Sequence, residues 1–142
     1  MKLLTDAAET GNKPDIDALL SAVPYCTHLG VRGRIMGGAP LLELPFGQHL
    51  IGNPIIPALH GGVIGSLLET AAIAQMLWET GVSKLPKPVD ITVDYLRTGR
   101  AATSFARARI ARQGRRVVNV QAEMWQEDPA KPIAALRGHF LV

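Results

Sequence analysis

The sequence predicts an α+β fold in which one long helix packs on one face of an antiparallel sheet. The observations behind this prediction are an apolar helical stripe between residues 60 and 80, period-two alternation in later segments, and short turns between those segments. Strands joined by short turns pair antiparallel, because a parallel pair needs a long crossover connection. Runs of strands with one inserted helix are typical of the α+β class, whereas strict β–α alternation is not.

A short helix is expected near the N-terminus, at residues 15–22. Pro14 precedes it, and Asp15 and Asp17 suit the positive end of a helix. Pro24 is expected to end it, because proline cannot continue a helix.

A β-hairpin is expected next, followed by an irregular loop. Residues 31–36 and 41–44 are short β-branched or leucine-rich runs, and Gly37 and Gly38 between them are typical turn residues. Residues 45–59 contain too many prolines and glycines for a regular element, so we expect a loop that leads directly into the long helix.

The remaining chain has the period of β-strands. Residues 89–95 alternate apolar and polar side chains, which predicts a strand covered on one face. The same alternation at 106–110 and 118–125, with a turn at residues 113–114, predicts a second hairpin. A last strand is expected at 133–141, after a turn signal of acidic residues and proline.

Length and composition limit the class of protein. A chain of 142 residues fits a single domain, 1–142, that can bury a core without disulfides or metal. No apolar run approaches the roughly 20 residues that a bilayer span needs, and the N-terminus lacks a secretory signal, so we expect a cytoplasmic protein that does not bind membranes. Cys26 is the only cysteine, which excludes an internal disulfide and a thiolate metal cluster.

The positive charge is concentrated in one region. The net charge is only +3, but seven arginines fall between Asp94 and Glu123 with no acidic residue among them. This pattern suits an anionic partner, and a solvated strand face is the alternative. Nucleic acid is disfavoured, because only 5% of the residues are aromatic and can stack on bases. The arginines are Arg97, Arg100, Arg107, Arg109, Arg112, Arg115 and Arg116.

The strongest signal is the segment 57–80, which reads HGGVIGSLLETAAIAQMLWET from His60 and is followed by Gly81, a helix stop. Its apolar residues lie on nearly every side, which indicates a helix wrapped by other structure. Burying the charge of Glu69 there without a partner would cost several kcal/mol, so Glu69 either borders a cleft or interface or takes part in chemistry. The alternative is a solvated stripe shared with Ser66 and Gln75.

The start of this helix is also unusual, because Gly61 and Gly62 each weaken a helix by roughly 1 kcal/mol. The N–H groups of a first helical turn have no partner within the helix and lie at its positive end, and glycine allows a carbonyl to approach them. This predicts an oxyanion hole. The alternative is that the glycines allow close packing of helix against sheet.

The length of the helix restricts how these features act together. Eight residues separate Gly61 from Glu69, which is about 12 Å along the axis at about 1.5 Å per residue. One helix cannot present both groups to one carbonyl. If both are catalytic, each site must combine Gly61 of one chain with Glu69 of a second chain, so we expect a two-fold homodimer.

These residues resemble a known family. The run NPIIPALHGGVIGSLLE from Asn53 to Glu69, with LGVRGRIMGGAPLLELPF before it and VDITVDYLRTG after it, is similar to the PaaI-type branch of the hotdog-fold acyl-CoA thioesterases. The resemblance implies a long central helix wrapped by a five- or six-stranded antiparallel sheet. It also implies hydrolysis of an acyl-CoA without metal or cofactor, by homodimers that commonly assemble as tetramers.

Carried over by position, the resemblance gives each residue a role. Gly61 would donate its N–H to the thioester carbonyl, and Glu69 would be the general base or the nucleophile. Asn53 would help to hold the attacking water. His60 would brace the loop or, alternatively, bond to the thioester, and the remaining substrate-binding candidates beside these residues are Gly62 and Thr70.

The arginine-rich region then has a natural ligand in the phosphates of coenzyme A, since guanidinium groups bind phosphate in bidentate fashion. Four arginines at predicted turns are the candidates: Arg97, Arg100, Arg115 and Arg116. Other functions remain open, because a fold does not fix function. The alternatives are a non-catalytic acyl-CoA binding protein and a dehydratase acting on hydroxyacyl thioesters. The acid at position 69 disfavours the first, and HGG at the helix start disfavours the second.

Overall fold

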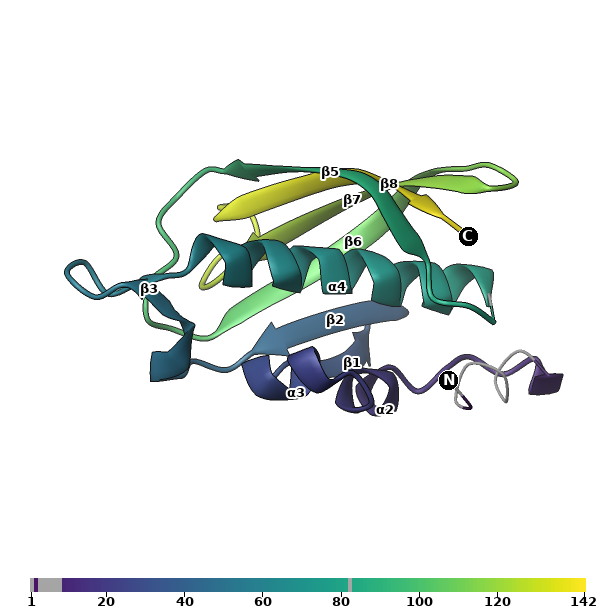
Figure 1. The fold of residues 1–142 in the computed structure, drawn as a ribbon, viewed down its shortest axis with the longest axis horizontal. Helices are drawn as coiled ribbons and strands as arrows, with labels where there is room; N and C mark the ends of the chain where they lie inside the picture. Colours follow the sequence, from purple (N-terminus) through teal and green to yellow (C-terminus); the bar gives the residue numbers. More distant parts are fainter. Residues whose placement is uncertain (1, 3–8, 82) are drawn as a thin grey trace.

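The computed structural model describes residues 2, 9–81 and 83–142. The long helix α4 (Gly61–Thr80) lies across one face of a six-stranded sheet, as expected (Figure 1). The strand order is β1-β2-β6-β7-β8-β5, and every neighbouring pair is antiparallel. The strands are β1 (Arg32–Met36), β2 (Ala39–Leu44), β5 (Lys87–Tyr95), β6 (Ser104–Gln113), β7 (Val117–Trp125) and β8 (Ala134–Leu141).

Two short helices precede the sheet. In α2 (Ile16–Ser21), the side chain of Asp15 accepts a hydrogen bond from the N–H of Ala18 at 3.1 Å and so caps the helix. The second helix, α3 (Pro24–Leu29), was not expected from the sequence. Pro24 does follow the end of α2, but it also starts α3, because a first helical position needs no N–H.

Turn residues explain both the success and the failure of the loop predictions. Gly37 and Gly38 have φ of 63° and 77° and join β1 to β2 as a tight hairpin turn. The prediction of an irregular segment at 45–59 was wrong in part. The segment contains a 3-10 turn, η1 (Gln48–Leu50), and a two-stranded ribbon of β3 (Ile51–Asn53) and β4 (Ala58–Leu59). Pro54 and Pro57 lie in the turn between the two strands, where they break no ladder.

The core lies between α4 and the sheet, and the edge of the sheet at β5 is open. Met76 of α4 and Phe140 of β8 are completely buried there. The apolar face expected for 89–95 is only partly covered, since Val89 is 58% exposed and Tyr95 57%. The reason is that β5 is an edge strand, paired on one side with β8 (Figure 1). An edge strand with an apolar face is a ready surface for another chain.

Candidate active site

The residues before α4 fix the position of its first turn. The N–H of Leu59 donates to the carbonyl of Gly99 at 2.9 Å, and the N–H of His60 donates to the carbonyl of Leu50 at 2.8 Å. His60 is the N-cap, and its Nδ1 accepts from the N–H of Gly62 at 2.9 Å. A ring nitrogen that accepts carries no proton, so the imidazole N–H of His60 lies at Nε2. His60 therefore braces the start of the helix, and its Nε2–H has no acceptor in the part of the chain that the structure describes.

The first turn of α4 leaves one backbone donor available. Gly62 donates to the His60 side chain, and Val63 and Ile64 donate to the carbonyl of His60 at 3.0 and 3.2 Å. Within the described residues, the N–H of Gly61 has no acceptor, and it lies at the positive end of the helix dipole. This N–H can stabilise a negative oxygen, as the sequence predicts.

Tyr95 contributes to this turn and was not among the predicted site residues. Its hydroxyl donates to the carbonyl of Gly61 at 2.9 Å. A Cβ on Gly61 would lie 3.5 Å from the hydroxyl oxygen of Tyr95, so the tyrosine ring lies beside the start of the helix. Tyr95 and Gly61 are 34 positions apart, and no local pattern predicts a contact at that separation.

A cleft of about 500 Å³ is lined in part by Gly61. Asn53, Tyr95 and Arg97 are among the side chains that line it. The Oδ1 of Asn53 accepts from the N–H of Ile55 at 3.0 Å, which holds the side chain in the turn after β3. The structure therefore brings Asn53, His60, Gly61 and Arg97 together at one end of α4.

Glu69 lies elsewhere on the helix and does not line this cleft. Its side chain is half-buried and, among the described residues, forms no ion pair or hydrogen bond. The neighbouring hydroxyls are directed to the helix backbone: Ser66 donates to Gly62 O at 2.7 Å and Thr70 donates to Ser66 O at 2.6 Å. The stripe suggested for Ser66, Glu69 and Gln75 is wrong in its last member, because Gln75 is buried.

The four arginines considered for phosphate binding lie at two ends of the sheet. Arg97 also lines an adjoining cleft of about 340 Å³ with Arg100, where Arg100 forms an ion pair with Glu127 at 2.6 Å. Arg115 and Arg116 lie in the turn before β7. The nine residues of β7, at about 3.3 Å each, put this turn about 30 Å from the other end of the strand. Within one chain, only Arg97 and Arg100 are close to Gly61.

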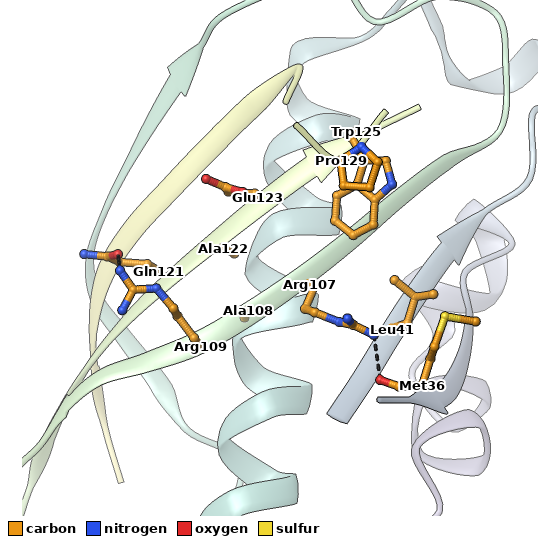
Figure 2. Close-up of a pocket in the computed structure, with 10 residues that line it drawn as sticks. All are labelled: Met36, Leu41, Arg107, Ala108, Arg109, Gln121, Ala122, Glu123, Trp125 and Pro129. Carbon is orange, nitrogen blue, oxygen red and sulfur yellow. Dashed lines mark hydrogen bonds between the residues drawn. The ribbon is translucent and has the colours of Figure 1, made fainter. Parts of the chain in front are cut away.

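Two other arginines of the cationic region lie on the face of the sheet away from α4 (Figure 2). Arg107 donates to the carbonyl of Met36 at 2.7 Å, and the guanidinium of Arg109 donates to the side chain of Gln121. Figure 2 shows that the two arginine side chains of β6 point in different directions, Arg107 toward Met36 and Arg109 toward Gln121 of β7. The arginine-rich region is therefore not a single patch, which agrees in part with the solvated-face alternative.

A long helix on one face of a six-stranded antiparallel sheet is the arrangement of the hotdog fold. The thioesterase superfamily model matches residues 57–133, more than half of the chain. The protein belongs to the thioesterase superfamily. The superfamily indicates thioester hydrolysis in general.

Solved structures agree with this assignment. A protein from Chromobacterium violaceum is 37% identical, with a TM-score of 0.77, over 100% of this chain and 97% of its own. The PaaI protein from the phenylacetic acid degradation operon of E. coli matches at 22% identity over 100% of both chains, with a TM-score of 0.74. A phenylacetic acid degradation-related protein from Ralstonia eutropha matches at 22% identity over 89% of this chain and 98% of its own, with a TM-score of 0.75. The expected hotdog fold and likeness to PaaI-type proteins are confirmed.

A comparison with curated proteins finds no match. None of the helices in the described part of the chain is long and apolar enough to cross a membrane.

Proposed function

We propose that the protein is an acyl-CoA thioesterase that hydrolyses its substrate to the free acid and CoA at sites shared between two chains. The observation that carries the proposal is the N–H of Gly61, which has no acceptor among the described residues, lies at the positive end of α4 and belongs to a residue that lines a cleft. This N–H binds the thioester carbonyl oxygen and stabilises its negative charge as the carbonyl carbon becomes tetrahedral. Membership in the thioesterase superfamily supports the reaction class.

Glu69 of the other chain supplies the second catalytic group. As a general base, its carboxylate takes a proton from water while the water oxygen attacks the carbonyl carbon, and the CoA sulfur leaves as the carbonyl re-forms. As a nucleophile, it would instead form an anhydride that water then hydrolyses. Both routes use the same two groups. Asn53 holds the water, and the Nε2–H of His60 is a second donor near the carbonyl.

The dimer follows from the distances along α4. If two α4 helices pack antiparallel about a two-fold axis, Gly61 of one chain is level with Glu69 of the other when the axis crosses at Gly65. A Cβ on Gly65 would meet only the Tyr95 hydroxyl, at 3.8 Å, so contacts within the chain do not require a glycine there. Close approach of a second helix does explain it.

The open edge of the sheet supports the same dimer. The hydroxyl of Tyr95 in β5 contacts Gly61, so the exposed apolar face of β5 lies next to the partly exposed residues of the first half of α4. One partner can cover both surfaces. Arg97 and Arg100 are then the candidates for the CoA phosphates at each site. The assembly of dimers into a tetramer, and a cytoplasmic location, are carried into the proposal from the sequence.

The test is thiol release from short, long and aromatic acyl-CoAs by the wild type and by Glu69→Gln. We expect wild-type turnover of at least one substrate and a loss in kcat of roughly 100-fold or more in the variant, since a general base contributes that much. Undiminished hydrolysis by the variant would remove Glu69 from the mechanism. Binding of acyl-CoA without turnover by the wild type would indicate a non-catalytic binding protein instead.

A further inference from the structure

A second cleft begins next to Glu69 and is not part of the site around Gly61. It lies between α4 and the two N-terminal helices and has a volume of about 140 Å³. Thr70, which follows Glu69 directly, and Ile73, four residues beyond Glu69, both line it. Residues four apart are neighbours on a helix surface. Two residues that line this cleft therefore lie within one helical turn of Glu69.

The walls of the cleft are apolar and offer no free polar group. The described residues that line it include no charged side chain, and most are aliphatic residues of α2 and α4. Thr70 directs its hydroxyl to the carbonyl of Ser66. Burial raises the pKa of the Cys26 thiol, more than the hydrogen bond with Thr70 lowers it, so the thiol is neutral near pH 7. A group that binds here is recognised as a hydrocarbon, by burial alone.

We infer that this cleft binds the acyl group of the thioester and that it serves the Glu69 of its own chain. The inference rests on the proposed function, because it takes Glu69 as the group at the scissile carbonyl. Each site then has two sides. One chain supplies Glu69 and the acyl cleft, while its partner supplies Gly61 and the arginines for CoA.

The volume of the cleft indicates which class of acyl group it can bind. A methylene group occupies about as much space as a water molecule in the liquid, about 30 Å³, so a cleft of about 140 Å³ accepts about four to six carbons. The lining face of α4 from Thr70 to Leu77 is about 10 Å long, which suits an extended chain of that size. The preferred substrates are short- to medium-chain apolar acyl-CoAs.

A chain-length series tests this directly. For acetyl-, butyryl-, hexanoyl-, octanoyl- and dodecanoyl-CoA, we expect wild-type kcat/KM to rise about fourfold per added methylene up to hexanoyl-CoA and then to stop rising. Ala74→Leu fills the cleft, so kcat/KM for hexanoyl-CoA should fall roughly 10-fold or more, a much larger fall than for acetyl-CoA. A profile that Ala74→Leu leaves unchanged would overturn the inference.

A second variant, Leu85→Ala, tests the inference even if Ala74→Leu does not fold. Leu85 lines the same cleft from an exposed position, so Leu85→Ala should fold and should move the preferred chain length upward by removing one wall. Leu141→Ala is the matched control, because Leu141 is similarly exposed but lies at the end of β8, outside the cleft. An upward shift in both variants, or in neither, would contradict the assignment.

Heterodimers test which chain the cleft serves. A dimer of a Gly61→Val chain and a Glu69→Ala chain has one complete site, whose Glu69 comes from the Gly61→Val chain. Ala74→Leu should shorten the preferred acyl chain when it is added to the Gly61→Val chain and should have no effect on the Glu69→Ala chain. The reverse result would assign the cleft to the opposite carboxylate.

The inference and the proposed function fail in different ways. Normal turnover with a chain-length profile that ignores both cleft variants would overturn the inference alone. Absence of turnover with every acyl-CoA would overturn the proposed function. In that case, a rise in Tm with sodium hexanoate that Ala74→Leu abolishes would still support a hydrocarbon site, and no rise in the wild type would remove it.

Discussion

The two halves of α4 differ in how the chain covers them. The first half has a stripe that the chain covers only in part, formed by Gly61, Gly62, Gly65, Ser66 and Glu69. The helices α2 and α3 lie over the second half. The second half is also tied to the rest of the fold. The indole N–H of Trp78 donates to the carbonyl of Gly38 at 3.1 Å, and the Lys13 ammonium donates to the carbonyl of Trp78 at 2.6 Å. One helix thus contains a segment that its own chain covers and a segment whose surface the chain leaves partly uncovered.

This difference separates stability from activity along one helix. Residues of the second half hold α4 in the core, and most of them are buried. The first half also contributes Val63, Ile64, Leu67 and Leu68 to the core, but the residues of its stripe are not buried. In the proposed mechanism these stripe residues act in catalysis. Substitutions in this stripe and in the buried residues of the second half should therefore have opposite effects on unfolding and on turnover.

The largest effect is expected for stability in the second half. Met76 is fully buried, so Met76→Ala should lower the free energy of unfolding by about 2–5 kcal/mol. Activity per folded molecule should stay near that of the wild type. Chemical denaturation and active-site-normalised kcat measure the two quantities, and a selective loss of kcat would break the proposed division of the helix.

The reverse effect is expected for Gly61→Ala. Alanine favours a helix more than glycine does, and its Cβ would make only an ordinary contact with Tyr95, so the Tm should not fall. The same methyl group displaces the thioester carbonyl from the Gly61 N–H, which should lower kcat/KM about 100-fold. Thermal melting and thiol release measure both. Full activity would show that this N–H does not bind the carbonyl.

The open edge of β5 is expected to hold the dimer. Val89→Asp puts a charge on the exposed face of that edge and should shift the protein toward folded monomers, with at least a roughly tenfold loss of activity. Val117→Asp is the control, because Val117 is also exposed but lies in β7 near the opposite end of the sheet from Gly61. Sedimentation velocity distinguishes them, and equal behaviour of both variants would place the interface elsewhere.

The smallest effect is expected for Tyr95→Phe, which removes the hydrogen bond to the carbonyl of Gly61 and keeps the ring. A typical net contribution of about 1 kcal/mol corresponds to a loss in kcat of about fivefold. KM should change less than kcat if Tyr95 only positions the first turn of α4. A fall in Tm with no loss in kcat would assign the hydrogen bond to folding alone.

Much of the fold could be predicted from periodicity, since β6, β7 and β8 alternate cleanly and α4 carries a continuous apolar pattern. Turn chemistry also placed the hairpin at Gly37 and Gly38. The helix α3 was missed because Pro24 is compatible with both the end of one helix and the start of the next. The exposed face of β5 could not be anticipated, because the same alternation suits a central strand and an edge strand covered by another chain.

The candidate site was predictable only where its signals are local. Gly61, His60 and Glu69 stand out because glycines at a helix start and a carboxylate among apolar residues are unusual on their own. Tyr95 could not be found this way, because an exposed tyrosine at a strand end carries no mark of its contact with Gly61. The separation of Arg115 and Arg116 from Arg97 likewise depends on sheet topology, which the spacing of arginines does not determine.

The central claim is that each site combines Gly61 of one chain with Glu69 of another. Gly61→Val and Glu69→Ala homodimers should each be inactive, and a purified heterodimer of the two carries one complete site. We expect this heterodimer to recover about half of the wild-type kcat per dimer, since one of its two equivalent sites is intact. A heterodimer as inactive as both parents would contradict the account.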